Sequence, residues 1–337
     1  MALNKTDSQL EQGTLRPPSE ANSLLIRVVR NCPWNKCTFC PGYKGEKFSI
    51  RSLEEILLEI ENIDSVIKKS VHTIFLQDAD ALVIPVDSLE KIIVHIKAVF
   101  PELKRITAYA RSSTLAHRTI DELVRLKNAG LSRIHVGVES GCNDVLRLIK
   151  KGVTADKQLE GCLNVKSAGL ELCCYIMPGL GGKEFSEING IETGQLIAKI
   201  QPDHIRLRTL HVLEGTPLAD DYLNGRFQPL NEEETVKEIR QLISLLKNTR
   251  TQIISDHRIN LLFELQGKLP DDYNKLMAVI DKFLNLEPDK KELFIIGRNK
   301  KLIKKLDDIE NEEVITQLSS IKNGYKKIIP VPANVLY

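Results

Sequence analysis

The chain has 337 residues, 42% of them hydrophobic and 27% charged, with a formal net charge of +2. This composition is typical of a globular protein with a large core. The small net charge gives no electrostatic reason to expect a nucleic-acid or membrane partner, and no apolar stretch approaches the roughly 20 residues of a spanning helix. Residues 1–20 are polar and lack the apolar region of a secretory signal, so we expect a cytoplasmic protein.

Six short apolar runs after this N-terminal extension predict β-strands. They lie at 24–29, 72–77, 105–110, 133–138, 170–177 and 204–210. Segments with helical periodicity separate them, at 52–69, 86–100, 120–129, 156–168 and 186–200. Connections this long require parallel strands, because each must cross one face of the sheet. We therefore predict an α/β fold, a partial (β/α)6 TIM-like barrel, since a full barrel needs eight such units.

The pattern changes after Pro217, where helical periodicity continues without strand signals. Helices are predicted at 231–249, 275–286 and 301–318. This divides the chain into an extension (1–20), a core barrel (21–220) and a helical C-terminal region (221–337). Basic residues near position 300 adjoin acidic ones, and aromatic residues make up only 5% of the chain. Both features favour mutual charge pairing over a nucleic-acid surface.

Three of the seven cysteines lie within nine residues, directly after the first predicted strand. Cys32, Cys37 and Cys40 have the spacing C-x4-C-x2-C. Three thiols in a tight loop at the carboxyl end of a strand predict a metal or iron–sulfur site. Three protein ligands would leave one iron of a four-iron cluster open to a small molecule, as a catalytic zinc site keeps one open position.

Four interpretations of the cysteine loop compete. Structural zinc would need a fourth ligand, but the next cysteine is Cys142 and the nearest following histidine is His72. A plant-type two-iron site shares this spacing but needs a fourth cysteine in a small β-rich module. Ordinary buried cysteines are the third interpretation, which we favour for Cys173 and Cys174 within a predicted strand. The fourth is a three-cysteine [4Fe–4S] cluster at the mouth of an α/β barrel.

The loop NCPWNKCTFC and its surroundings, over about residues 23–220, resemble the radical S-adenosylmethionine (radical SAM) superfamily. The usual motif is C-x3-C-x2-C with an aromatic residue before the last cysteine, a position that Phe39 fills here. This chain has one extra residue between the first two cysteines. It resembles an uncharacterised subgroup with the same longer loop, in the branch of oxygen-independent coproporphyrinogen oxidase and the methylthiotransferases.

The resemblance implies an enzyme that holds a [4Fe–4S] cluster on the three cysteines and binds S-adenosylmethionine (SAM) at the open iron. One electron from the cluster would cleave SAM to a 5′-deoxyadenosyl radical, which abstracts hydrogen from a substrate that the sequence does not identify. A flavodoxin or ferredoxin is implied as electron donor, because no second cluster motif is present. The alternative is an iron–sulfur binding or electron-transfer protein without SAM chemistry. The sequence does not identify a catalytic residue.

The resemblance also suggests contacts to SAM in the first half of the barrel. Phe39 would lie against the adenine or its ribose. Gln77 and Asp78 end the second strand, where relatives have a Gly-Gly-Glu-type turn that contacts the methionine amine. Arg111 follows the third strand and would meet the methionine carboxylate or pair with Glu139.

Further contacts are implied at the later strand ends. Glu139, in the segment VGVESG, resembles the residue that reaches the ribose hydroxyls. Met177 and Gly179 begin a glycine-containing turn that resembles the one beside the adenine, where glycine permits close backbone approach. His211 lies in a segment that resembles the one closing over the adenine. His211 and His257 could also exchange protons with the substrate.

Overall fold

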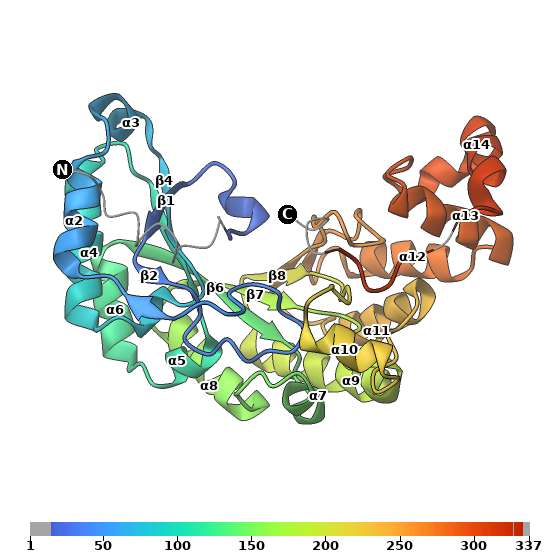
Figure 1. Cartoon of the computed structure of the whole chain (residues 1–337), viewed down its shortest axis with the longest axis horizontal. Helices are drawn as coiled ribbons and strands as arrows, with labels where there is room; N and C mark the ends of the chain where they lie inside the picture. The colour runs from blue at the N-terminus through green and yellow to red at the C-terminus, as the bar shows by residue number, and fades with distance from the viewer. Residues whose placement is uncertain (1–14, 326, 333–337) are drawn as a thin grey trace. The chain divides into compact units, whose positions relative to one another are not determined.

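The computed structural model describes residues 15–325 and 327–332, so most of the predicted extension lies outside the described residues. Eight strands form one sheet in the order β1-β4-β5-β6-β7-β8-β9-β10 (Figure 1). The pairs β1–β4, β4–β5, β5–β6 and β8–β9 are parallel, and β9–β10 is antiparallel. The predicted fold class, a partial TIM-like α/β barrel with a helical C-terminal region, is confirmed.

The six predicted strands are present with small changes at their ends. The sheet consists of β1 (Leu24–Arg27), β4 (Thr73–Gln77), β5 (Arg105–Ala110), β6 (Leu131–Glu139), β7 (Glu171–Ile176), β8 (His204–Leu207), β9 (Thr251–Ile254) and β10 (Gly267–Leu269). The last two were not predicted. A short antiparallel pair, β2 (Val29–Arg30) and β3 (Ser49–Ile50), flanks the cysteine loop.

The chain groups into two compact units. The first comprises the residues up to Cys37, Gly42–Val138 and Gly152–Cys174. The second comprises Thr38–Pro41, Glu139–Lys151 and the residues from Tyr175 onward. The division into 1–20, 21–220 and 221–337 stays a prediction.

The helices of the first unit pack beside its strands (Figure 1). They are η1 (Pro18–Glu20), α2 (Leu53–Glu61), α3 (Ser65–Ser70), η2 (Ala81–Val83), α4 (Val86–Val99), α5 (Ser112–Ala116), α6 (Ile120–Ala129) and α8 (Ala155–Ser167). Within this unit α2 contacts α4, α4 contacts α6 and α6 contacts α8. The single helix predicted at 52–69 is wrong, because Asp64 accepts a hydrogen bond from the Val66 N–H (2.7 Å) and starts a new helix there.

The second unit holds the remaining helices. They are α7 (Asn143–Leu148), α9 (Gly182–Ile200), α10 (Pro217–Leu223), α11 (Glu232–Ser244), α12 (Tyr273–Leu284), α13 (Pro288–Asn299), η3 (Leu306–Glu310) and α14 (Glu312–Lys322). The helix predicted at 301–318 is wrong. Lys301 has a positive φ of 60°, and Asp308 Oδ2 accepts the N–H groups of Lys304 and Lys305 (2.8 Å each), which produces a turn. Within the described residues, no helix is long and apolar enough to cross a membrane.

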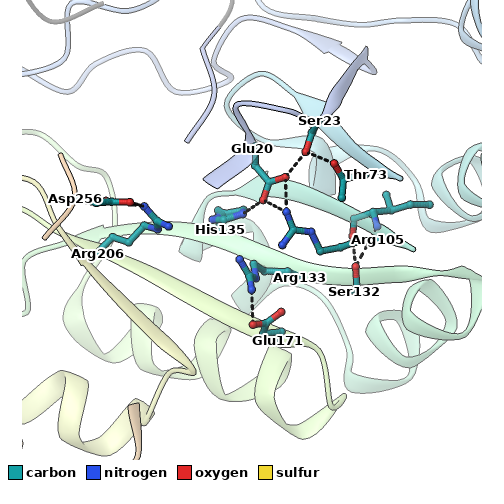
Figure 2. Close-up of polar contacts among 11 residues, drawn as sticks. Glu20, Ser23, Thr73, Arg105, Ser132, Arg133, His135, Glu171, Arg206 and Asp256 are labelled. Carbon is teal, nitrogen blue, oxygen red and sulfur yellow. Dashed lines mark hydrogen bonds and ion pairs between the residues drawn. The ribbon is translucent and has the colours of Figure 1, made fainter. Parts of the chain in front are cut away.

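A polar network around Glu20 fills part of the interior of the first unit (Figure 2). The Glu20 carboxylate accepts hydrogen bonds from Ser23 Oγ (2.6 Å) and Arg105 (3.1 Å), and it lies 3.2 Å from His135 Nε2. Glu20 and His135 are fully buried. Burial opposes the ionisation of Glu20, but the hydrogen bonds from His135 and Ser23 and the charge of Arg105 outweigh it and lower its pKa to about 2. These contacts hold η1 against β5 and β6.

Candidate functional site

The three cysteines of the loop differ from the other four in exposure. All seven are free thiols; Cys32, Cys37 and Cys40 are partly exposed, whereas the others are buried, namely Cys142, Cys162, Cys173 and Cys174. The predicted core positions of Cys173 and Cys174 are confirmed. A thiol must be reachable to bind a metal, so only the three loop cysteines suit an accessible site.

Hydrogen bonds brace the part of the loop that belongs to the first unit. The Asn35 N–H donates to Cys32 Sγ (3.4 Å). Lys44 Nζ donates to the carbonyl oxygens of Asn35 (3.0 Å) and Cys37 (2.9 Å). Hydrogen bonds to cysteine sulfur tune the potential of iron–sulfur clusters, so this backbone N–H fits a thiolate ligand at Cys32.

Asp78 connects both ends of the loop to the carboxyl end of β4. Its Oδ2 lies 3.1 Å from Arg27 Nε and accepts the Asn31 N–H (3.2 Å), while Tyr43 Oη donates to Oδ1 (3.4 Å). Asp78 is buried, and burial raises its pKa although Arg27 opposes this. The neighbouring Gln77, the last residue of β4, is also buried. Asp78 is therefore already engaged with the loop.

Asp80 and Arg111 lie at the ends of two adjacent strands of the first unit. Asp80 is fully buried, and its Oδ2 accepts a hydrogen bond from Thr114 Oγ1 (2.5 Å). Its Oδ1 accepts no hydrogen bond from the described residues. Burial raises the pKa of Asp80 to about 6, while Thr114 and the backbone of Arg111 act in the opposite direction. The Arg111 guanidinium lies 5.2 Å from the centre of the Trp34 ring, over the cysteine loop.

Phe39 and its neighbours in the loop belong to the second unit. The Thr38 N–H donates to the Ile149 carbonyl (2.9 Å), and the Thr38 carbonyl accepts the Leu218 N–H (3.0 Å). Phe39 is partly buried and packs against an apolar cluster that includes Met177. Two predicted SAM contacts, Phe39 and Met177, therefore belong to the same apolar region of the second unit.

Glu139 ends β6 and pairs with a lysine. Its Oε1 lies 3.1 Å from Lys151 Nζ, and both side chains are largely buried. Lys151 Nζ also lies 5.9 Å from the centre of the Phe39 ring. The Glu139 carbonyl accepts the Met177 N–H (2.9 Å), so the pairing of β6 with β7 continues one residue past the end of β7. Lys151 was not predicted, since nothing in its sequence surroundings distinguishes it from a surface lysine.

The turn after β7 is supported by Glu238, which was also not predicted. Gly179 has a φ of +86° and donates its N–H to Glu238 Oε1 (2.9 Å). Ser186 Oγ and Asn189 Nδ2 donate to the same carboxylate (2.8 Å each). Glu238 is buried, and burial raises its pKa. An acid on the apolar face of α11, four residues before Leu242, was the available sequence signal.

Backbone strain gathers at these positions. Of the eight non-glycine residues with positive φ in the described part of the chain, five lie in the segment between β2 and β3, which contains the cysteine loop, or at the end of β4 or β6, namely Asn31, Asn35, Tyr43, Asp78 and Glu139. Such conformations cost of order 1–3 kcal/mol each for residues that do not favour them, and they cluster at functional sites. The distribution supports the predicted location of the site.

Two histidines follow adjacent strands of the second unit. His211 follows β8 and His257 follows β9, and both are partly buried. Burial lowers the pKa of each to about 4; Lys327 adds to this for His211, and Arg208 for His257. Both imidazoles are therefore neutral at pH 7.

No three His, Cys, Asp or Glu side chains among residues 15–325 and 327–332 lie together as ligands of a metal ion. The loop nonetheless has the chemistry that an iron–sulfur cluster requires, with three free, partly exposed thiols and a backbone N–H directed at one sulfur. The residues present therefore fit the group by donor type.

Comparisons with known proteins agree on the family. Residues 26–192 match the radical SAM superfamily, and residues 202–260 match the Radical_SAM C-terminal domain. The chain is 22% identical over 277 residues to a tRNA uridine(34) acetyltransferase of Methanocaldococcus jannaschii, covering 70% of this chain and 50% of that protein. It is 27% identical over 207 residues to a biotin synthase of Clostridium perfringens, covering 60% of each.

A solved structure shares the fold. Coproporphyrinogen III oxidase from Escherichia coli matches with a TM-score of 0.50 and 15% identity, over 66% of this chain and 52% of that one. The chain spans between a quarter and a half of the length of two tRNA uridine(34) acetyltransferases that it matches.

Proposed function

Because the chain belongs to the radical SAM superfamily, we propose that it is an enzyme that cleaves SAM reductively at a [4Fe–4S] cluster. Cys32, Cys37 and Cys40 would hold the cluster. The observation that carries the proposal is the family match over residues 26–192, which includes the only three cysteines of the chain that are partly exposed. When bound, the cluster and SAM supply a one-electron cleavage that gives a 5′-deoxyadenosyl radical able to abstract hydrogen from a substrate.

The first unit would orient the methionine part of SAM. Asp78 fixes both ends of the cysteine loop through Asn31 and Tyr43. Asp80 Oδ1 is a buried acceptor without a hydrogen bond from the described residues, which suits a methionine ammonium. Gln77 ends β4 and Arg111 directly follows the adjacent β5, and the Arg111 guanidinium suits the methionine carboxylate.

The second unit would hold the nucleoside part. Phe39 packs against the apolar cluster that contains Met177, and this surface would face the adenine. Gly179 would let the backbone approach the ring, with its turn fixed by Glu238. Glu139 would accept hydrogen bonds from the ribose hydroxyls while Lys151 balances its charge.

An external electron donor, a flavodoxin or ferredoxin, would reduce the cluster. The relatives do not point to one substrate, because two of their names refer to tRNA uridine and another refers to biotin. The alternative is an iron–sulfur electron-transfer protein without SAM chemistry, which shares the three cysteines.

The test is the formation of 5′-deoxyadenosine by anaerobically reconstituted protein with dithionite and SAM. We expect 5′-deoxyadenosine from the wild type and none from Cys37→Ala, which should also lose its iron. The matched control is Cys173→Ala, in a buried strand position, which should retain both iron and cleavage. A Cys37→Ala protein that keeps four irons would contradict the ligand assignment. A wild type that keeps its cluster but leaves SAM intact would favour electron transfer.

A further inference from the structure

Two strand ends in the second unit bring three nitrogen-bearing side chains to one edge of the sheet. β8 and β9 are parallel, with Arg206 opposite Ile254, so the chain leaves both strands at the same edge. Arg208 and His211 follow β8, and His257 follows β9. The active sites of α/β barrels lie at this carboxyl edge.

Asn260 fixes the two strand ends to each other. Its Nδ2 donates to the Leu207 carbonyl (2.8 Å), and its Oδ1 accepts the Thr209 N–H (3.0 Å). Its own N–H donates to the His257 carbonyl (2.9 Å). Three hydrogen bonds from one residue therefore define how the segment after β9 lies against the end of β8.

Both histidines hydrogen-bond to the backbone of Ile259. The Ile259 N–H donates to His257 Nδ1 (3.4 Å), and His211 also hydrogen-bonds to the Ile259 backbone. A neutral imidazole that accepts at Nδ1 carries its proton on Nε2. Because both imidazoles are neutral at pH 7, His257 can offer its Nε2–H to a ligand.

More cations than carboxylates shift the pKa values of His211 and His257. The cations are Arg208, Arg258 and Lys327, which lower these pKa values, and the carboxylates are Asp256 and Glu232, which raise them.

Both carboxylates are already engaged. Asp256 accepts two hydrogen bonds from Arg206 (2.8 and 2.7 Å; Figure 2), and Glu232 pairs with Lys327 (2.7 Å). Arg208 is partly buried, and no side-chain hydrogen bond or ion pair joins it to the described residues. A positive charge at this edge is therefore left for a ligand.

We propose that Arg208, His211 and His257 form a subsite for an anionic group of the substrate, a carboxylate or a phosphate. This proposal rests on the proposed function, because that function makes the carboxyl edge of the barrel the place of reaction. A guanidinium binds either oxyanion through paired charge-assisted hydrogen bonds, and an imidazole N–H adds a further donor. His211 then contacts the substrate rather than the adenine.

Inorganic phosphate is the probe, added to the full-length protein with its cluster oxidised. The chain has seven histidines, so selectively labelled histidine ring signals give a simple NMR spectrum. The signals are assigned with His211→Gln and His257→Gln. We expect phosphate to shift both signals and to raise the pKa of both imidazoles, since an anion favours their protonated form. Arg208→Gln should weaken phosphate binding about tenfold or more.

The matched control is Arg250→Gln, an exposed arginine just before the first residue of β9, at the opposite end of that strand. It should bind phosphate like the wild type. Arg208→Lys keeps the charge and should lose less affinity than Arg208→Gln, which separates charge loss from misfolding. Unchanged histidine signals, or equal affinities of Arg208→Gln and the wild type, would overturn the proposal.

Two comparisons identify the ligand. A dicarboxylate such as succinate added in place of phosphate tests the carboxylate form of the substrate group, and binding of either anion supports the subsite. Displacement of phosphate by SAM would overturn it, because the anion held there would be the carboxylate of the cofactor. Phosphate binding does not require SAM cleavage, so a protein that binds phosphate but leaves SAM intact contradicts the proposed function alone.

Discussion

Buried carboxylates at the strand ends have different partners, and this gives them different roles. Asp78 is surrounded by donors from the cysteine loop and by Arg27. Asp80 keeps one oxygen without a donor among the described residues. We therefore assign the support of the loop to Asp78 and the proposed methionine ammonium contact to Asp80.

Asp78→Asn should destabilise the protein by roughly 3 kcal/mol, because it leaves the largely buried Arg27 without its ion pair. It should also lower the iron content, since the loop loses its connection to β4. Urea unfolding and iron analysis measure both effects. Asp87→Asn is the control, because Asp87 is exposed and solvent screens its ion pair with Arg125, so its removal should leave stability and iron content unchanged. Unchanged stability and iron with a raised KM for SAM would instead favour a direct contact to SAM.

Helix α11 reaches the proposed cofactor site through one side chain. Glu238 accepts the Gly179 N–H together with donors from α9, so α11 fixes the turn after β7. Glu238→Gln removes the carboxylate charge and puts an NH2 group in place of one accepting oxygen, which weakens the hydrogen bonds that fix the Gly179 turn. We expect the KM for SAM to rise about tenfold, equivalent to about 1.4 kcal/mol, with a smaller change in kcat.

The control for this position is Glu233→Gln on the same helix, where the side chain is a third exposed and pairs with Lys237 and Lys291. It should leave the KM within a factor of about two. A general loss of stability in Glu238→Gln without a change in KM would show that Glu238 supports only the fold.

The short helix η1 is held by a carboxylate whose ionisation depends on pH. The Glu20 pKa lies at about 2 against an ordinary value of 4.5. A carboxylate whose pKa is lower in the folded than in the unfolded state stabilises the fold at pH values above its ordinary pKa. This stability is lost as the pH falls from 4.5 toward 2. The Glu20 charge contributes on the order of 3 kcal/mol to the free energy of unfolding at neutral pH, and about 2 kcal/mol of this is lost by pH 3.

The stability difference between the wild type and Glu20→Gln should therefore shrink by about 2 kcal/mol between pH 7 and pH 3, measured by urea unfolding. Glu102→Gln changes an exposed acid before β5 and should follow the wild-type profile. A difference that stays constant over this range would mean that the Glu20 charge does not contribute to folding.

The sequence predicted elements well where local signals were strong. β5 and α6 match their predicted bounds, because the short apolar run of the strand and the Thr119 capping box of the helix are local features. β9 was missed, since Thr251–Ile254 contains only two strongly apolar residues and becomes a strand by pairing with β8.

The candidate site also followed local signals only in part. The residue types at the strand ends were predictable from the sequence. The partners Lys151 and Glu238 were not, because tertiary contacts bring them to Glu139 and Gly179.

At the scale of the whole molecule, the proposed site is assembled from many short segments at strand ends rather than from one motif. We propose that the first unit contributes the start of the cysteine loop and the ends of β4 and β5, and that the second unit contributes Phe39, the ends of β6 and β7 and the segments after β8 and β9. The proposed arrangement would let a partial barrel keep a common cofactor while the later strand ends vary with the substrate.

The central claim is that one iron of the cluster is open and binds the amine and carboxylate of SAM. The most direct measurement is electron paramagnetic resonance of the reduced protein, with and without SAM labelled with nitrogen-15 at the amine and oxygen-17 at the carboxylate. We expect a changed signal and magnetic coupling to both labels. A signal that stays the same when SAM is added, with no coupling to either label, would contradict the claim.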